Sequence, residues 1–183
     1  EFVGTKLDFM LSNPPYGKSW ASEQKHIKDG SDVIDPRFIV KLKDYWGNEE
    51  SCDATPRSSD GQLLFLMEMV NKMKSPEHNG IGGRIASVHN GSSLFTGDAG
   101  GGESNIRRYI IENDLLNAIV QLPNNLFYNT GITTYIWLLS NNKPQQRKGK
   151  VQLIDASLMF RKLRKNLGNK NCEFAPEHIA EIM

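Results

Sequence analysis

The sequence lacks several features that would place it in a specialised class of protein. Its 183 residues contain only two cysteines, Cys52 and Cys172, which stand alone in polar surroundings. Isolated cysteines suit a reducing compartment, so we expect a cytoplasmic location and no disulfide framework. No apolar run is long enough to span a membrane, and no signal peptide is visible. From these absences we expect neither a secreted disulfide scaffold nor a membrane protein.

Metal ligands and net charge are also scarce. The four histidines, His26, His78, His89 and His178, show no ligand spacing, so we expect no metal site. Lysine and arginine number 22 against 21 aspartates and glutamates, which leaves a net charge of +1. The chain as a whole is therefore not a polybasic nucleic-acid binder. Any contact with a nucleic acid must come from a local patch or from a partner subunit.

The sequence is organised around residues 7–16. Their first half is apolar and predicts a short buried strand. Pro14 and Pro15 have no backbone donor and end the strand, and Asn13 is held extended because it precedes a proline. The carboxyl ends of strands are where open α/β sheets bind their ligands. We therefore predict a stiff turn at a ligand site.

This turn offers two hydrogen-bond acceptors and an aromatic ring. The acceptors are the side-chain oxygen of Asn13 and the backbone carbonyl of Pro14, and the ring is that of Tyr16. Such a set suits a planar group that carries an NH₂, such as adenine or a glutamine amide. The acceptors would stabilise positive charge as the nitrogen attacks an activated electrophile. The alternative is a surface turn, because Asn-Pro often opens one.

The stretch Asn13-Pro14-Pro15-Tyr16 resembles the catalytic motif of S-adenosylmethionine-dependent methyltransferases that act on the amino group of adenine in DNA. The rest of the chain is similar to one branch of them, the modification subunit of type I restriction–modification systems, over almost its whole length. The segments that carry the resemblance are residues 13–20, 35–38, 57–62, 88–97, 102–108, 122–123, 126–132 and 164–166.

The resemblance implies an α/β fold, the C-terminal half of a Rossmann-like methyltransferase sheet whose last strand is antiparallel. It also implies methyl transfer from S-adenosylmethionine to the exocyclic amine of a flipped-out adenine. Tyr16 would stack on one face of the base and Phe127 on the other, because family members place an aromatic residue in that loop, and Tyr128 is the alternative. Phe127 could instead be a buried anchor of the loop. The implied catalytic residues are Asn13, Pro14, Pro15 and Tyr16, with Asn13 also at the cofactor.

The implied partners are DNA and the specificity and restriction subunits of a type I complex. The specificity subunit reads the DNA target in such systems. Two other functions stay open for the same motif. One is a methyltransferase that acts on a protein glutamine or on RNA, and the other is an inactive fragment that serves only in assembly. The segments downstream of the motif favour the DNA enzyme.

The main cofactor motif is absent from the sequence. A nucleotide-type cofactor site needs a glycine-rich strand-to-helix turn with an acidic residue about 20 positions later. The glycine-rich residues 97–102 follow no clear strand and indicate a flexible loop. We therefore interpret residues 1–160 as a partial methyltransferase domain without its upstream cofactor-binding half. Residues 161–183 would form a basic segment and a truncated helix.

Hydrophobic periodicity predicts the remaining elements. A capping box at residues 59–62 should start a helix that runs to about Lys74, and Ser104 should cap a second helix through Asn113 with Ile106, Ile110 and Ile111 inward. Residues 75–83 should form a turn. The expected strands are residues 84–89, 115–122, 133–140, which should be antiparallel, and 151–154 at an edge.

Three regions allow two interpretations each. Polar residues 17–58 are either an insertion that packs its aromatic side chains on the sheet edge, or a lid that holds cations near phosphates. His89 would face the cleft, and a solvated or capping role is the commoner one. The basic residues of 161–170 are either a solvated tail or phosphate contacts. The cationic candidates are Lys18, Arg37, Lys41 and Lys43 in the first region and Arg161, Lys162, Arg164, Lys165 and Lys170 in the last.

Overall fold

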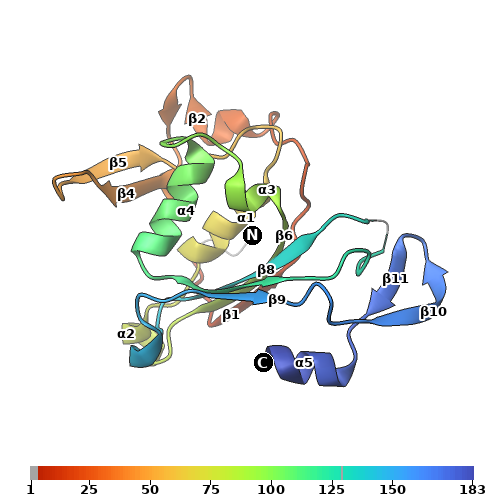
Figure 1. Ribbon diagram of the computed structural model, residues 1–183. Helices are drawn as coiled ribbons and strands as arrows, with labels where there is room; N and C mark the ends of the chain where they lie inside the picture. Colours follow the sequence, from red (N-terminus) through yellow and green to blue (C-terminus); the bar gives the residue numbers. More distant parts are fainter. Residues whose placement is uncertain (1–3, 129) are drawn as a thin grey trace.

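A five-stranded mixed sheet forms the centre of the computed structural model, which describes residues 4–128 and 130–183 (Figure 1). Strand β8 is antiparallel to both its neighbours, β6 and β7, whereas β1 is parallel to β6 and β9 is parallel to β7. The expected α/β sheet with an antiparallel strand is confirmed, and that strand lies inside the sheet. The order is β1 (Phe9–Ser12), β6 (Arg84–Asn90), β8 (Thr134–Ser140), β7 (Leu116–Gln121) and β9 (Gln152–Asp155).

These directions give the sheet two different edges. The carboxyl ends of β1, β6, β7 and β9 and the amino end of β8 lie together, and we call this the carboxyl edge. Ligands of open α/β sheets bind outside this edge.

Helices α1 (Gln62–Asn71) and α4 (Gly102–Glu112) cover one face of the sheet (Figure 1). Leu66 of α1 and Ile106 and Ile110 of α4 are fully buried in the main core together with Trp137 of β8. The helical spacing of apolar residues predicted these inward faces, because side chains three or four positions apart share one face. Burying large apolar side chains of this kind contributes about 1.5–3 kcal/mol each.

The predicted helix ends differ from the observed ones. Helix α1 begins at Gln62 behind Gly61, which makes no side-chain cap, so the predicted capping box is wrong. Instead the Asp60 carboxylate accepts a hydrogen bond from the Gln62 backbone, at 3.3 Å. The helix ends at Asn71 rather than Lys74, because Met73 forms a parallel bridge with Leu7. Residues 75–83, predicted as a turn, contain one helical turn, α2 (Pro76–Asn79).

Helix α4 also starts earlier than expected. It begins at Gly102, so Ser104 lies inside the first turn and does not cap it, and Ile111 is exposed rather than inward. A Cβ at Gly102 would lie 1.7 Å from the Thr55 carbonyl oxygen, so only glycine allows this close approach. The start of α4 is therefore set by packing against a distant segment rather than by a local cap.

Residues 17–58 are folded, not irregular. They form two antiparallel hairpins, and the alternation along β4 buries Val40 and Leu42 beside α4. Trp20 and Phe38 are buried in the main core, as the insertion interpretation expects, but Tyr45 and Trp46 are 94% and 81% exposed and do not pack. The elements are η1 (Gln24–His26), β2 (Lys28–Asp29), β3 (Asp32–Val33), η2 (Pro36–Phe38), β4 (Ile39–Lys43) and β5 (Glu49–Asp53).

Two of the cations predicted to lie near phosphates in this region, Arg37 and Lys41, are paired with carboxylates. Arg37 forms ion pairs with Asp35 at 2.5 Å and with Glu68 of α1 at 2.8 Å. These pairs tie the insertion to α1, so a phosphate would have to displace both carboxylates from Arg37. Lys41 lies 3.8 Å from Glu49 across the β4–β5 hairpin.

Strand β1 is exposed where burial was expected. Met10 is buried against the main core, but Phe9 is 63% and Leu11 87% exposed. Among the residues that the structure describes, β1 pairs only with β6, and nothing covers the face that Phe9 and Leu11 share. The apolar run therefore marks an edge strand with one buried face.

The C-terminal residues cover part of the other face of the sheet, around β7 and β8 rather than β1 (Figure 1). Hairpin strands β10 (Arg161–Leu167) and β11 (Lys170–Glu173) lead into helix α5 (Pro176–Ile182). Phe174 and Ile182 pack on a second hydrophobic cluster around Val120, Leu122 and Ala156. The basic segment is thus an ordered hairpin rather than a loose tail. The remaining short helices are α3 (Ser92–Phe95) and η3 (Gln145–Arg147).

Candidate active site

The Asn13–Tyr16 turn directly follows β1 at the carboxyl edge. Asn13 and Pro15 are exposed, Pro14 is buried, and Tyr16 is partly buried. Burial raises the pKa of the Tyr16 phenol, so the ring carries no charge at neutral pH. The turn therefore presents an open amide beside a partly packed, neutral aromatic ring.

The chain beyond this turn is fixed along residues 57–61. The Gly17 amide donates to Asp60 Oδ1 at 3.0 Å, and Gly17 has a φ of +67°, which favours glycine. The indole nitrogen of Trp20 donates to the Arg57 carbonyl at 2.9 Å. Two backbone bonds complete the contact, from Gly61 to Lys18 at 3.1 Å and from Trp20 to Ser58 at 2.9 Å.

A polar network connects the Asp60 carboxylate to the end of β6. The Gln62 amide group donates to Asp60 Oδ2 at 2.6 Å and to Asn90 Oδ1 at 2.8 Å. The Ser92 hydroxyl donates to Asp60 Oδ2 at 3.0 Å, and the Asn90 backbone amide donates to Gln62 Oε1 at 3.2 Å. Gln62 is only 2% exposed, so the network is sealed on one side. Sequence analysis missed it.

His89 belongs to this network and is completely buried. Its Nδ1 lies 3.2 Å from Gln62 Oε1, and because an amide oxygen can only accept, Nδ1 carries the proton. Burial lowers the pKa of His89 from 6.5 to about 4, although the nearby Asp60 charge opposes the shift. The expected solvated or capping histidine is therefore wrong, and His89 is a neutral core residue that packs edge-on to Trp137.

The loop from β7 to β8 carries the second predicted aromatic clamp. Phe127 is partly buried on the second hydrophobic cluster, whereas Tyr128 is 63% exposed. The loop is closed at its base by a hydrogen bond from the Thr133 hydroxyl to Asn124 Oδ1, at 2.8 Å. Which ring covers the base stays a prediction.

Strand β11 holds this loop along three consecutive carbonyls. The Lys170 ammonium donates to the Leu126 carbonyl at 2.7 Å, and the Asn171 amide donates to the Asn125 carbonyl at 3.1 Å. The Cys172 thiol lies 3.3 Å from the Asn124 carbonyl. The basic hairpin and the aromatic loop are therefore one connected surface at the carboxyl edge.

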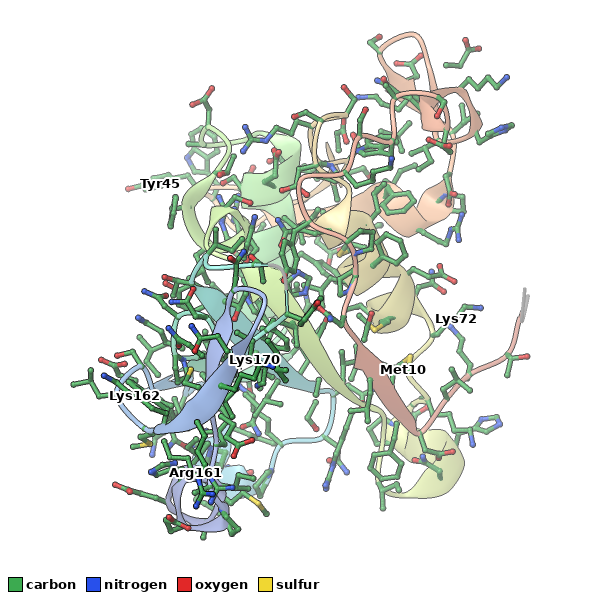
Figure 2. The ribbon with its side chains drawn as sticks, turned by 90° about the vertical axis from the view of Figure 1, so that its right-hand side faces the viewer. Met10, Tyr45, Lys72, Arg161, Lys162 and Lys170 are labelled. Carbon is green, nitrogen blue, oxygen red and sulfur yellow. The ribbon has the colours of Figure 1, made fainter. Side chains whose placement is uncertain are left out.

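The predicted phosphate contacts differ in their surroundings. Arg161 is paired with Glu173 at 2.8 Å, and Lys170 is occupied by backbone carbonyls. Lys162, Arg164 and Lys165 are exposed, and no carboxylate within residues 4–128 and 130–183 pairs with them. Figure 2 looks toward the carboxyl edge and shows hairpin β10–β11 in the foreground, with β1 and Met10 on the other side. Lys18 is exposed beside the Asn13–Tyr16 turn.

The described part of the chain has neither a metal-binding cluster nor a membrane-spanning helix. It contains no group of three His, Cys, Asp or Glu side chains placed to bind a metal ion. None of its helices is long and apolar enough to cross a membrane. Cys52 and Cys172 are both free thiols.

Comparison with known proteins identifies the family. Residues 2–183 match the family model described as N-6 DNA Methylase. The chain is 43% identical over 157 residues to the type I restriction enzyme MjaVII methylase subunit of Methanocaldococcus jannaschii, a match that covers 86% of the chain and 23% of that protein. It is 32% identical over 157 residues to the type I restriction enzyme HindI methylase subunit of Haemophilus influenzae, covering 85% of the chain and 29% of that protein.

A solved structure of a type I methyltransferase subunit is also similar to this chain. The type I restriction-modification system methyltransferase subunit from Streptococcus thermophilus superposes with a TM-score of 0.70 and 27% identity, over 98% of this chain and 31% of that one. The present chain thus spans less than a third of the length of these relatives. Because the family model matches nearly every residue, the chain belongs to the N-6 DNA methylase family.

Proposed function

We propose that this chain forms the base-binding side of the active site in a site-specific, adenine-specific DNA methyltransferase, the modification subunit of a type I restriction–modification enzyme. The observation that carries the proposal is the exposed amide of Asn13 beside the partly buried ring of Tyr16 at the carboxyl edge, in a chain of the N-6 DNA methylase family. Residues 1–160 would be the partial catalytic domain, and residues 161–183 a basic segment followed by a truncated helix.

The reaction assigns a task to each residue of the turn. The adenine amine lies inside the duplex, so the base must be flipped out at a cost of a few kcal/mol. The Asn13 side-chain oxygen and the Pro14 carbonyl would accept the two amine hydrogens, and Pro15 would keep the turn stiff. These acceptors would stabilise the positive charge that develops on the nitrogen as it bonds to the methyl carbon, while the methyl–sulfur bond of the sulfonium would break and leave its electron pair on a neutral thioether. The amine then loses one proton to water at the exposed edge.

S-adenosylmethionine would supply the electrophilic methyl group. Asn13 would face the reacting end of this cofactor, because its amide is exposed at the carboxyl edge, where open α/β sheets bind their ligands. The rest of the cofactor needs other residues, since the glycine-rich residues 97–102 follow α3 rather than a strand of the sheet. The chain alone should therefore bind the cofactor weakly.

The proposed partners follow from the same surface. DNA phosphates would meet Lys18 beside the turn and the cations of hairpin β10–β11, with the specificity subunit and the restriction subunit completing the complex in the cytoplasm. The exposed Arg164 and Lys165 support this assignment most directly, because their charges are unpaired within the described ranges. Arg161 would have to exchange Glu173 for a phosphate.

Stacking by Tyr16 can be measured separately from the chemistry. Tyr16→Ala should weaken capture of the flipped base by about 1–3 kcal/mol, and Tyr16→Phe should be much milder because the ring face remains. The full-length protein, assembled with the subunits it needs, is tested on a duplex whose target adenine is replaced by 2-aminopurine, after sequencing of methylated plasmid DNA has located that adenine. Equal fluorescence gain in all three proteins would contradict stacking.

Phosphate contact by the basic hairpin predicts a change in salt dependence. Replacing Arg164 and Lys165 together by glutamine should reduce the slope of log affinity against log salt by up to about 2, since each B-DNA contact contributes about 0.9. The matched control is the double replacement of Lys148 and Lys150, which are exposed at the opposite edge of the sheet. An unchanged slope in the Arg164/Lys165 variant would show that the hairpin is a solvated surface that does not contact DNA phosphates.

A further inference from the structure

We propose that Asp60 is a positioning residue for methyl transfer, which fixes the Asn13–Tyr16 turn relative to the end of β6. The inference rests on the proposed function, because it concerns the geometry of the same turn. Asp60 itself follows no strand and lies 47 positions after Asn13 in the sequence. Its role follows from the hydrogen bonds that its two carboxylate oxygens accept.

One oxygen holds the catalytic turn. Asp60 Oδ1 accepts from the backbone amide of Gly17, the residue that follows Tyr16, at 3.0 Å. It also accepts from the backbone amide of Gln62, at 3.3 Å. Gly17 is in the left-handed region, so the direction of its N–H determines how the chain leaves Tyr16. The carboxylate therefore anchors the downstream end of the turn to the start of α1.

The other oxygen holds the sheet. Asp60 Oδ2 accepts from the side chains of Gln62 and Ser92, at 2.6 and 3.0 Å. Gln62 and Ser92 in turn bind Asn90, the last residue of β6, at 2.8 and 2.6 Å. Because β6 pairs with β1, the upstream end of the turn is positioned by the same strand to which Asp60 is connected.

The network requires a carboxylate at this position. Three groups around Asp60 are donors, two backbone amides and the Gln62 side-chain amide, so both oxygens must act as acceptors. The single proton of the Ser92 hydroxyl is shared between Asp60 Oδ2 and Asn90 Oδ1, at 3.0 and 2.6 Å. An asparagine could still accept from Gly17, but its NH₂ would then face the NH₂ of Gln62. Gln62 cannot rotate in response without losing its bonds to His89 and the Asn90 amide.

Loss of Asp60 should move the turn without unfolding the protein. The bonds of Lys18 and Trp20 to residues 57–61 would remain, and so would the pairing of β1 with β6. Gly17 would lose its partner, and the groups at Asn13 and Tyr16 would no longer be held in register. A displacement of about 1 Å at reacting groups can lower a rate about 100-fold.

The test uses the full-length protein assembled with the subunits it needs, and the duplex whose methylated adenine has been mapped. Asp60→Ala should lower the single-turnover rate of methyl transfer by about 100-fold. The loss in rate should exceed any loss in affinity for the duplex or for S-adenosylmethionine, because the oxygens of Asp60 bind donors of the chain itself. Asp60→Asn, which keeps one acceptor for Gly17, should recover part of the rate.

Asp8→Asn is the matched control. The Asp8 carboxylate accepts from Lys74 and Asn79, both at 2.7 Å, at the amino end of β1 and away from the site. This variant should lower thermal stability and leave the rate per folded molecule unchanged. If Asp60→Ala loses activity only in step with stability, or methylates at the normal rate, Asp60 is structural and the inference is wrong.

The two levels of the proposal can fail separately. An inactive Asn13→Ala variant together with a fully active Asp60→Ala variant would overturn only the positioning role. A fully active Asn13→Ala variant would overturn the proposed function of the turn, and with it the inference about Asp60.

Discussion

Replacing Asn13 by alanine is expected to lower the rate of adenine methylation by about 10²–10³-fold, the usual result of losing one preorganised group that stabilises a transition state. The Asn13 side chain is exposed and makes no hydrogen bond within the described structure, so its removal should hardly change the free energy of unfolding. The measurement is single-turnover methylation of the mapped duplex by the assembled enzyme, with thermal unfolding in parallel.

The control is an exposed asparagine that lies far from the proposed active site. Asn142 is exposed just after β8 at the opposite edge of the sheet, and its side chain donates only to the Gly80 carbonyl, at 3.3 Å. Asn142→Ala should methylate normally. Normal activity of Asn13→Ala, or a loss that follows its thermal stability, would show that the turn is structural and that the catalytic assignment is wrong.

The sequence predicted elements whose cause is local. The spacing of Leu63, Leu66 and Met67 defined the buried face of α1, and the β-branched and aromatic residues of 133–140 marked β8. Two adjacent prolines ended β1 where the structure ends it. These features depend on side-chain periodicity and on backbone restrictions that act within a few residues.

Features that depend on distant contacts could not be predicted in this way. Asp60 was explained as part of a capping box, because that pattern satisfies the local rule, but its carboxylate binds Gly17, 43 positions earlier. Similarly, Arg37 forms an ion pair with Glu68, on a helix that follows much later in the sequence. The hairpins of residues 17–58 are short and polar on their outer faces, so their alternation gave only a weak signal.

In the candidate site, too, the locally determined part could be predicted and the part that depends on distant contacts could not. The Asn13–Tyr16 turn was recognisable because chemistry and backbone restriction occur together in four residues. The network behind it uses Gln62, Asn90 and Ser92, which come from two separate segments that both resemble the type I subunits. The available signal was that such polar residues occur beside strongly apolar runs, since polar groups that are buried need partners.

The buried His89 predicts a specific loss of stability in mild acid. Its pKa is about 4 in the folded protein, below its ordinary value of 6.5, because burial disfavours the charged ring. Between these two values the unfolded chain binds a proton that folded His89 does not, so stability is fully present above about pH 6.5 and falls as the pH falls toward 4. The whole shift corresponds to about 3 kcal/mol.

Urea unfolding at a series of pH values measures this loss, and His89→Asn is the variant that tests its source. Asparagine keeps a donor for Gln62 Oε1 but does not titrate, so the variant should be less stable at pH 7 and nearly independent of pH from 6.5 to 4. Carboxylates such as Asp8 and Asp35 act in another window, because their pKa values are lowered from 3.8 by Lys74 and Arg37. Their contribution is lost only as the pH falls below 3.8. If the His89→Asn variant keeps the same slope between pH 6.5 and 4, the buried neutral histidine is not its cause.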